Sequence, residues 1–364
     1  MFYEFLTGMV KGLLSGAVPG MHINNIVSTI NDPAGIVASY ASFIIFSFVP
    51  PIYLYSMNID IGVAMFPSQR MALQGRSREA LALSTSGALL SFMIMASLLA
   101  TNIVDPIFNL FSNEYIALAI ILFIIVALFI NQKRLFYALF IFLLTGLLGI
   151  ASMNIQNALM PMLSGFFGLP ALLQKGSEIE LPESTSSGGR TVLPFLLASF
   201  FGFVAASTKA VTPGVISILL YIWLRSDEEM MLGMGALVGS NAAATIGNFY
   251  VTGALRSGPA AQLARIELSI PLSKALFLLL LSAVLSFILL LLLSRYLVKV
   301  YRAINRWKTI FIALLLVLIF LFSGAGGVFL FFVSSTIGIL TIKLRVRRIN
   351  CMGCIMIPAL IGFL

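Results

Sequence analysis

Two Pro-Gly pairs, Pro19-Gly20 and Pro213-Gly214, interrupt strongly apolar stretches of the sequence and are each surrounded by polar side chains. A proline removes one helical hydrogen bond and a glycine lets the chain change direction, so each pair predicts a broken helix. Inside a membrane, the freed N–H and C=O groups are tolerated only beside protein or a cavity. Because helix N-termini attract anions, the two pairs predict an anion-binding site between broken helices.

Polar residues beside the two pairs are the candidate ligands for that anion. Ser15, His22 and Asn24 flank the first pair, and Lys209 and Thr212 flank the second. A cation at membrane depth implies an anionic ligand or a carboxylate partner, so Lys209 is the most informative of them. The alternative is a lysine that extends its charged end to the interface. His22 is either a proton relay, a donor to an anion or a packing residue.

Arg256 adds a second candidate cation, with an interfacial anchor as the alternative. Freed carbonyl groups, together with Asn24 or Asn241, are candidate ligands for a coupling Na⁺. No resident metal or other cofactor is expected beyond Na⁺ or a proton, because Cys351 and Cys354 have no second pair and read as packing residues. The predicted substrate site therefore comprises Ser15, Pro19, Gly20, His22, Asn24, Lys209, Thr212, Pro213, Gly214 and Arg256.

Composition places these residues in a membrane protein. Of 364 residues, 60% are hydrophobic and only 10% are charged, whereas a soluble domain has about 25% charged residues. A helix needs about 20 apolar residues to cross the bilayer, and several uncharged runs are long enough, namely 33–59, 80–104, 230–255 and 275–293. We therefore expect a multi-pass protein of the cell membrane.

The net charge of +9 is explained by topology rather than by a nucleic-acid partner. Nine of the 22 basic residues lie in two clusters, 295–308 and 343–348, that flank apolar runs. Basic residues in such places act as cytoplasmic anchors and contact anionic membrane lipids. No nucleic-acid binding is expected.

An internal repeat relates the two Pro-Gly pairs. The polar segment 175–190 is a linker that separates residues 1–174 from residues 191–364, and the second pair follows the first by 194 positions. Small residues recur every fourth position before both pairs, beginning at Gly8 and at Gly202. Arg76-Ser77 likewise resembles Arg256-Ser257, and 168–172 resembles 356–360. These ordered matches predict a duplication of 1–174 in 191–364.

Charge placement predicts that the two halves are inverted. In the first half, the turn between two apolar runs carries Lys133 and Arg134; in the second, the corresponding turn 323–327 is uncharged and the flanks are basic. The positive-inside rule puts the first turn in the cytoplasm and the second outside. We predict an all-α fold of roughly ten membrane segments in two inverted repeats, with 158–173 and 351–364 as broken or re-entrant pieces.

Five short motifs resemble those of one known family: 16–22, 67–75 with Ala80-Leu81, 168–170, 256–258 and 351–358. Together they resemble the large membrane subunit of tripartite tricarboxylate transporters, particularly its short archaeal-type relatives. The resemblance implies an ion-coupled translocating subunit that works with a small membrane subunit and an extracytoplasmic binding protein. It also implies that the Pro-Gly breaks form the substrate and ion site.

The leading functional hypothesis is secondary active transport of an organic anion, a carboxylate, by alternating access with Na⁺ or H⁺ coupling. The alternative is a polyprenyl-phosphate lipid translocase, because such proteins also have paired Pro-Gly breaks and an inverted repeat, and the cargo would then be a lipid phosphate. An enzyme is not expected, since the sequence contains no nucleophile–base arrangement and no metal-ligand cluster.

Overall fold

The computed structural model describes residues 2–18, 21–53, 65–130, 132–173, 192–209, 211–224, 226–266, 270–306 and 308–362. Every regular element in these ranges is a helix, as the sequence predicted. Five helical stretches are long and apolar enough to cross a membrane: Pro33–Tyr53, Ser77–Ala100, Asp227–Thr252, Leu272–Lys299 and Ile312–Lys343. A bent pair, Asp105–Phe111 with Glu114–Phe129, is a sixth candidate. The fold predicted from the sequence, with roughly ten membrane segments, therefore stays a prediction.

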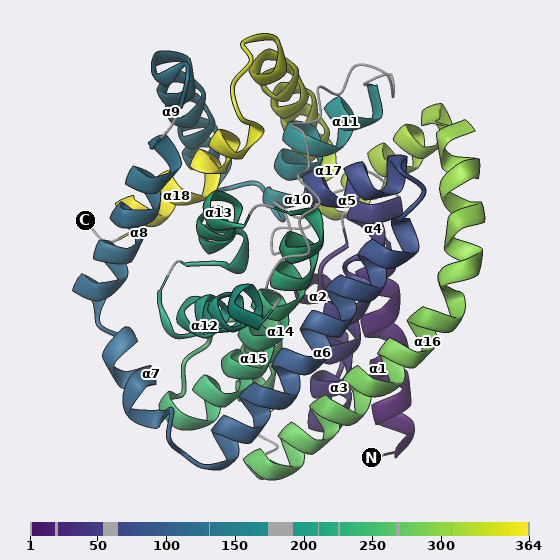
Figure 1. Ribbon diagram of the computed structural model, residues 1–364, viewed down its shortest axis with the longest axis vertical. Coiled ribbons are helices and arrows are strands. Elements are labelled where there is room, and N and C mark those ends of the chain that lie inside the picture. The colour runs from purple at the N-terminus through teal and green to yellow at the C-terminus, as the bar shows by residue number, and fades with distance from the viewer. Residues whose placement is uncertain are drawn as a thin grey trace.

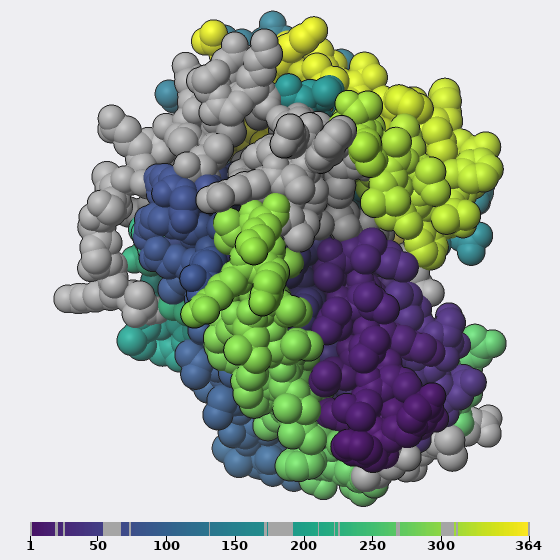
Figure 2. Space-filling model, turned by 90° about the vertical axis from the view of Figure 1, so that its right-hand side faces the viewer, coloured from purple at the N-terminus to yellow at the C-terminus, as the bar shows by residue number. Residues whose placement is uncertain are grey.

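A first group of three helices packs side by side, namely α1 (Phe2–Ala17), α3 (Pro33–Phe46) and α16 (Leu272–Arg306). The glycine stripe of α1 makes this packing close, since a Cβ at Gly8 would overlap Gly35 and one at Gly16 would overlap Phe43. On the other side of α3, the Ser42 and Ser286 hydroxyl oxygens lie 2.6 Å apart. Figure 2 shows α16 lying between α1 and α6 on one face of the molecule.

A second group packs in the same way and consists of α12 (Val192–Ser207), α14 (Asp227–Thr252) and α6 (Ser77–Ala100). Asn248 Nδ2 donates to the carbonyl oxygen of Ala206 at 3.0 Å, which ties α14 to the end of α12. Gly235 packs against the backbone of Ser84, which ties α14 to α6. Each group therefore combines two helices of one half with one helix of the other. In Figure 1, α6 runs from top to bottom and α16 from bottom to top.

The remaining long helices form an outer layer at the top and left of Figure 1: α8 (Glu114–Phe129), α9 (Leu135–Ala151) and α17 (Lys308–Lys343). Short pieces pack against them: α10 (Leu159–Leu163), the π-helix η3 (Ser164–Gly168), α11 (Leu169–Leu173), η4 (Arg348–Met352) and α18 (Gly353–Ile361). Here too each half packs against the other: α18 of the second half packs on α9 of the first, and η3 and α10 of the first half pack on α17 of the second. The expected turn 323–327 is a break in α17 at Gly324, where φ is 64° and ψ is −166°.

The basic segments expected on one side of the membrane lie together. Arg134 Nη1 donates to the carbonyl oxygen of Leu344 at 3.2 Å, so the turn before α9 contacts the basic segment after α17. Lys133, Arg134, Arg345 and Arg347 are exposed there. The charge argument put these two segments on the same side, and the structure places them next to each other.

The described helices on either side of each Pro-Gly pair are separate. α1 ends at Ala17, and the chain resumes as α2 (Ile23–Ile26) and η1 (Val27–Thr29). α12 ends at Ser207, and Pro213 is the first residue of α13 (Pro213–Trp223). Pro19, Gly20 and the linker 175–190 lie outside the described residues. The described residues also contain the short helices α4 (Val49–Tyr53), α5 (Met65–Leu73), α7 (Asp105–Phe111) and α15 (Gly258–Arg265).

Candidate functional site

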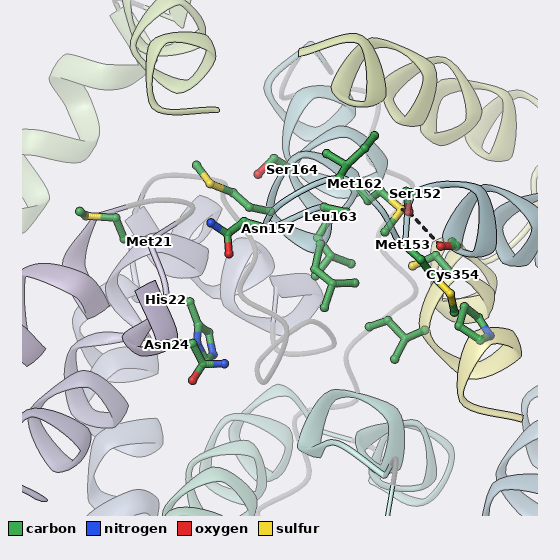
Figure 3. Close-up of a pocket in the computed structure, with 17 residues that line it drawn as sticks. Met21, His22, Asn24, Ser152, Met153, Asn157, Met162, Leu163, Ser164 and Cys354 are labelled. Carbon is green, nitrogen blue, oxygen red and sulfur yellow. Dashed lines mark hydrogen bonds between the residues drawn. The ribbon is translucent and has the colours of Figure 1, made fainter. Parts of the chain in front are cut away.

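A pocket of about 420 Å³ opens where the first break meets the outer layer. Three segments wall it: residues 21–24 after the first break, residues 149–164 from the end of α9 to the start of η3, and residues 354–358 of α18. Figure 3 shows these segments converging on the pocket. Both halves of the chain therefore contribute to its wall, and its size is in the range of small-molecule sites.

His22 enters the pocket as the cap of α2. The backbone N–H of Asn24 donates to His22 Nδ1 at 3.2 Å, so Nε2 carries the proton of the neutral ring and acts as a donor. The ring lies edge-on to Phe43 with 4.9 Å between centroids. Because Phe43 is fully buried in α3, this contact fixes the ring against the first group of helices.

Asn24 joins the pocket wall to the second half of the chain. Its Oδ1 accepts a hydrogen bond from the backbone N–H of Gly258, the first residue of α15, at 3.0 Å. Gln262, one turn further along α15, donates from Nε2 to the carbonyl oxygen of Ile30 at 3.0 Å. These two bonds hold the return segment after the first break in place, and they leave Asn24 Nδ2 as the donor end of its side chain.

The opposite wall consists of the end of α9, the turns over 152–158, the short helix α10 and the first residue of the π-helix η3. Asn157 has a positive φ of 52°, and its Nδ2 donates to the carbonyl oxygen of Phe322 at 3.1 Å. Ser152 Oγ donates to the carbonyl oxygen of Gly149 and lies 3.4 Å from Met162 Sδ. Ser164 lines the pocket and begins η3. Short π-helices occur frequently at functional sites, which agrees with this position.

The structure places the Lys209 side chain on the surface of the protein rather than in its interior. Its side chain is 53% exposed and forms an ion pair with Glu114, the first residue of α8. The expected carboxylate partner is therefore present, but the expected burial of Lys209 is wrong. Glu114 lies 95 residues earlier in the chain, and only the packing of α8 beside the second break brings it there.

Arg256 lies between α14 and α15, and its side chain contacts the end of α12. Its Nη2 donates to the carbonyl oxygen of Ser207 at 3.1 Å and so satisfies one of the carbonyl groups that α12 leaves without a helical partner. The side chain is partly buried, and this loss of hydration lowers the pKa of Arg256 below its ordinary value. The residue supports the second break but does not line the pocket.

The other predicted residues of the second break organise the start of α13. Thr212 caps the helix by accepting a hydrogen bond from the backbone N–H of Val215 at 3.3 Å. Pro213 occupies the first helical position, where its missing N–H costs nothing. The carbonyl oxygen of Gly214 accepts from Ser217 Oγ at 2.6 Å. None of the three lines the pocket beside the first break.

Ser15 and Asn241 serve helix packing. Ser15 is fully buried, and its hydroxyl donates to the carbonyl oxygen of Gly12 at 3.0 Å. Asn241 Nδ2 donates to the carbonyl oxygen of Gly202 at 3.3 Å, between α14 and α12. Of the predicted site residues that the structure describes, His22 and Asn24 line the pocket. The sequence argument missed Ser152, Asn157 and Ser164, although it singled out 158–173 as a broken segment.

These features define a multi-pass helical membrane protein with a small-molecule pocket between its halves. The chain belongs to the Tripartite tricarboxylate transporter TctA family, which matches residues 3–353 and confirms the resemblance seen in the motifs. This is a family of transporter components. The chain is also similar to Uncharacterized protein MJ1079 of Methanocaldococcus jannaschii, with 26% identity over 390 residues that cover 99% of this chain and 98% of that protein. No solved structure matches it significantly.

Proposed function

We propose that this protein carries an organic anion with a carboxylate group across the cell membrane by alternating access, coupled to Na⁺ or protons. The observation that supports this most directly is the pocket beside the first break, which both halves of the chain line. Its lining includes Asn24, whose Nδ2 can donate a hydrogen bond to a carboxylate. Membership in a tricarboxylate transporter family supports the same class of cargo.

The exchange of helices between the halves supports an inverted repeat. A Cβ added at Gly165 would lie 2.6 Å from the Cβ of Ser334, and one added at Gly353 would lie 2.7 Å from Thr145 Oγ1. The first contact joins η3 to α17 and the second joins α18 to α9, so the two contacts are reciprocal. Alternating access would then be a rocking of one three-helix group against the other around the pocket.

The second break, between α12 and α13, has a separate role in the proposed transport. Lys209, Thr212, Pro213, Gly214 and Arg256 surround the gap between α12 and α13, where an ion pair and a helix start lie together. We assign to this region the attraction of the anion as it enters or leaves, and to Ser15, Pro19 and Gly20 the support of the first break. Asn24 and Asn241 remain the proposed ligands of a coupling Na⁺.

Family membership also supports the proposal that this chain works with partner proteins. A large subunit of this family works with a small membrane subunit and an extracytoplasmic binding protein, and we propose the same assembly for this chain. Neither the family match nor the similar protein MJ1079 supports a polyprenyl-phosphate cargo.

Uptake into proteoliposomes tests the proposal. The purified protein is reconstituted, and entry of radiolabelled mono-, di- and tricarboxylates is followed with and without an inward Na⁺ or proton gradient. We expect uptake of at least one carboxylate above that of empty liposomes, and faster uptake with one of the gradients. Transport of no carboxylate under any gradient contradicts the proposal.

A further inference from the structure

Two buried glutamines occupy matching positions in the two halves of the chain. Gln69 is the fifth residue of α5, and Gln262 is the fifth residue of α15. Only 5% of Gln69 and 6% of Gln262 is exposed. α5 packs against α14, whereas α15 packs against α3 and η1. In Figure 1, α5 lies near the top of the molecule and α15 in its lower part, so the two glutamines lie toward opposite ends.

The backbone segments beside these two helices also match. Ile30 directly follows η1 and lies three residues before the start of α3, whereas Leu224 directly follows α13 and lies three residues before the start of α14. Both residues have an extended backbone, with ψ of 119° at Ile30 and 136° at Leu224. The glutamines are 193 positions apart and these two residues 194, close to the spacing of the two Pro-Gly pairs. The carbonyl groups of Ile30 and Leu224 are therefore equivalent.

The hydrogen bonds of the two glutamines differ. Gln262 Nε2 donates to the carbonyl oxygen of Ile30 at 3.0 Å. Gln69 Nε2 is buried and has no hydrogen-bond partner among the residues that the structure describes. A buried N–H donor without an acceptor has lost its hydration without a replacement, which is unfavourable. A conformation that gives Gln69 Nε2 an acceptor therefore gains stability relative to this one.

An ion pair keeps Gln69 close to the equivalent carbonyl group. Arg70, the residue after Gln69, has its Nε 3.0 Å from both carboxylate oxygens of Asp227, the first residue of α14. Leu224 lies three residues before Asp227 and so belongs to the same short segment. A rotation of α5 about this ion pair can bring Gln69 Nε2 to the carbonyl oxygen of Leu224 without separating α5 from α14.

We propose that the two glutamine bonds form alternately in the transport cycle. In this structure Gln262 is bonded to Ile30; in the opposite conformation Gln69 donates to the carbonyl oxygen of Leu224 and the Gln262–Ile30 bond is broken. This inference rests on the proposed function and deepens its alternating access. Exchanging one bond for an equivalent one keeps the two conformations close in free energy, so that substrate binding can shift their populations.

Distances between spin labels test the proposal in the full-length protein. Ser28 in η1 and Ala264 near the end of α15 are exposed, so Ser28→Cys with Ala264→Cys places two labels across the end that the Gln262–Ile30 bond holds. Cys351 and Cys354 are buried and do not compete for the label. Pulsed electron paramagnetic resonance then gives the ratio of longer-distance to shorter-distance populations in the purified protein.

Methionine keeps the length of glutamine without its hydrogen bonds. Gln262→Met removes the bond of the present conformation, so we expect the ratio of longer to shorter distances to rise by about fivefold. Adding Gln69→Met removes the bond of the opposite conformation, so the double variant is expected to lose about fivefold again. Gln132→Met is the matched control, because Gln132 Nε2 also donates to a backbone carbonyl, that of Leu128, away from both ends.

The reversal by the second substitution distinguishes this role from a purely structural one. A ratio in Gln262→Met equal to that in Gln132→Met, or a double variant that stays at the Gln262→Met ratio, overturns the inference. Carboxylate uptake by the same proteins keeps the two proposals apart. Uptake by the wild type with unresponsive distances overturns the inference alone, whereas responsive distances without uptake of any carboxylate support the two conformations and contradict the proposed cargo.

Discussion

Asn24 and Gly258 meet across 234 residues of sequence, through a 3.0 Å hydrogen bond from the backbone N–H of Gly258 to Asn24 Oδ1. The contact requires glycine, because a Cβ at position 258 would overlap the Asn24 side chain. It joins the return segment of the first break to the N-terminus of α15. One wall of the pocket is therefore held by the other half of the chain, so movement of one half relative to the other would alter the pocket.

Gly258→Ala tests this connection. The added methyl group displaces Asn24, so we expect weaker carboxylate binding by about tenfold and a lower thermal midpoint in detergent. Gly75→Ala is not a suitable control, because Gly75 has a positive φ; Gly326 is helical and its Cβ position makes only ordinary contacts. Gly326→Ala is therefore the matched variant, and equal thermal midpoints and affinities for both variants would contradict the role of the Asn24–Gly258 contact.

Arg70 and Asp227 form a second link between the halves. Arg70 Nε lies 3.0 Å from both carboxylate oxygens of Asp227, and only 3% of the Asp227 side chain is exposed. Removing the arginine leaves a buried carboxylate without its partner, so Arg70→Ala is expected to cost about 3 kcal/mol of unfolding free energy. Arg78→Ala, an exposed arginine of the same region, is the control. A loss in Arg70→Ala no larger than in Arg78→Ala would show that the pair contributes little.

Nearby, Arg76 bonds to Glu228 at 2.6 Å and to Glu79 at 2.7 Å, and these hydrogen bonds hold the pKa of Arg76 above its ordinary value. The arginine therefore stays charged across the acidic range in which the two glutamates titrate. Lowering the pH weakens the cluster only by protonating the two glutamates. Stability in detergent is expected to fall as the pH drops through the carboxylate range, and Arg76→Ala should reduce that dependence. An identical pH profile for wild type and Arg76→Ala would contradict this account.

The sequence predicted the two breaks between helices, because prolines and glycines affect the backbone locally. Pro213, for example, favours the start of a helix independently of how the rest of the chain packs. The sequence predicted the helical class from composition and the family from short motifs. His22 and Asn24 were found because polar residues beside a break in an apolar run are conspicuous. Ser152 and Ser164 were not found, because a serine in an apolar segment commonly bonds its own backbone and looks like a packing residue. The expected burial of Lys209 was wrong, because the exposed ion pair with Glu114 depends on tertiary packing.

The reciprocal contacts of the outer layer give a prediction about stability. A Cβ at Gly353 would overlap the carbonyl oxygen of Phe142, and one at Gly165 would lie 2.7 Å from the carbonyl oxygen of Phe331. Gly353→Ala and Gly165→Ala should each lower stability by about 1–3 kcal/mol through overpacking. Chemical unfolding in detergent measures both. Stability equal to that of Gly326→Ala in either variant would contradict the close packing at that site.

Substitutions of Lys209 and Glu114 distinguish a role of Lys209 in anion binding from a role in stability. Because both side chains are largely exposed, Lys209→Ala should leave the thermal midpoint nearly unchanged. If Lys209 attracts the anion, uptake falls in Lys209→Ala, and the exchanged pair Lys209→Glu with Glu114→Lys does not restore the original rate. Full uptake in Lys209→Ala would remove Lys209 from the proposed site.

The most direct measurement is uptake by a protein whose pocket has been filled. Ala158 lines the pocket between Asn157 and Leu159, and it is only partly buried, so Ala158→Trp can occupy the space that a carboxylate would take. Wild type and Ala158→Trp are reconstituted at equal amounts, and uptake of the best-transported carboxylate is compared, with thermal midpoints confirming that both are folded. The account predicts uptake by the wild type and none above background by Ala158→Trp. Equal uptake by a folded Ala158→Trp protein would show that the transported anion does not pass through this pocket.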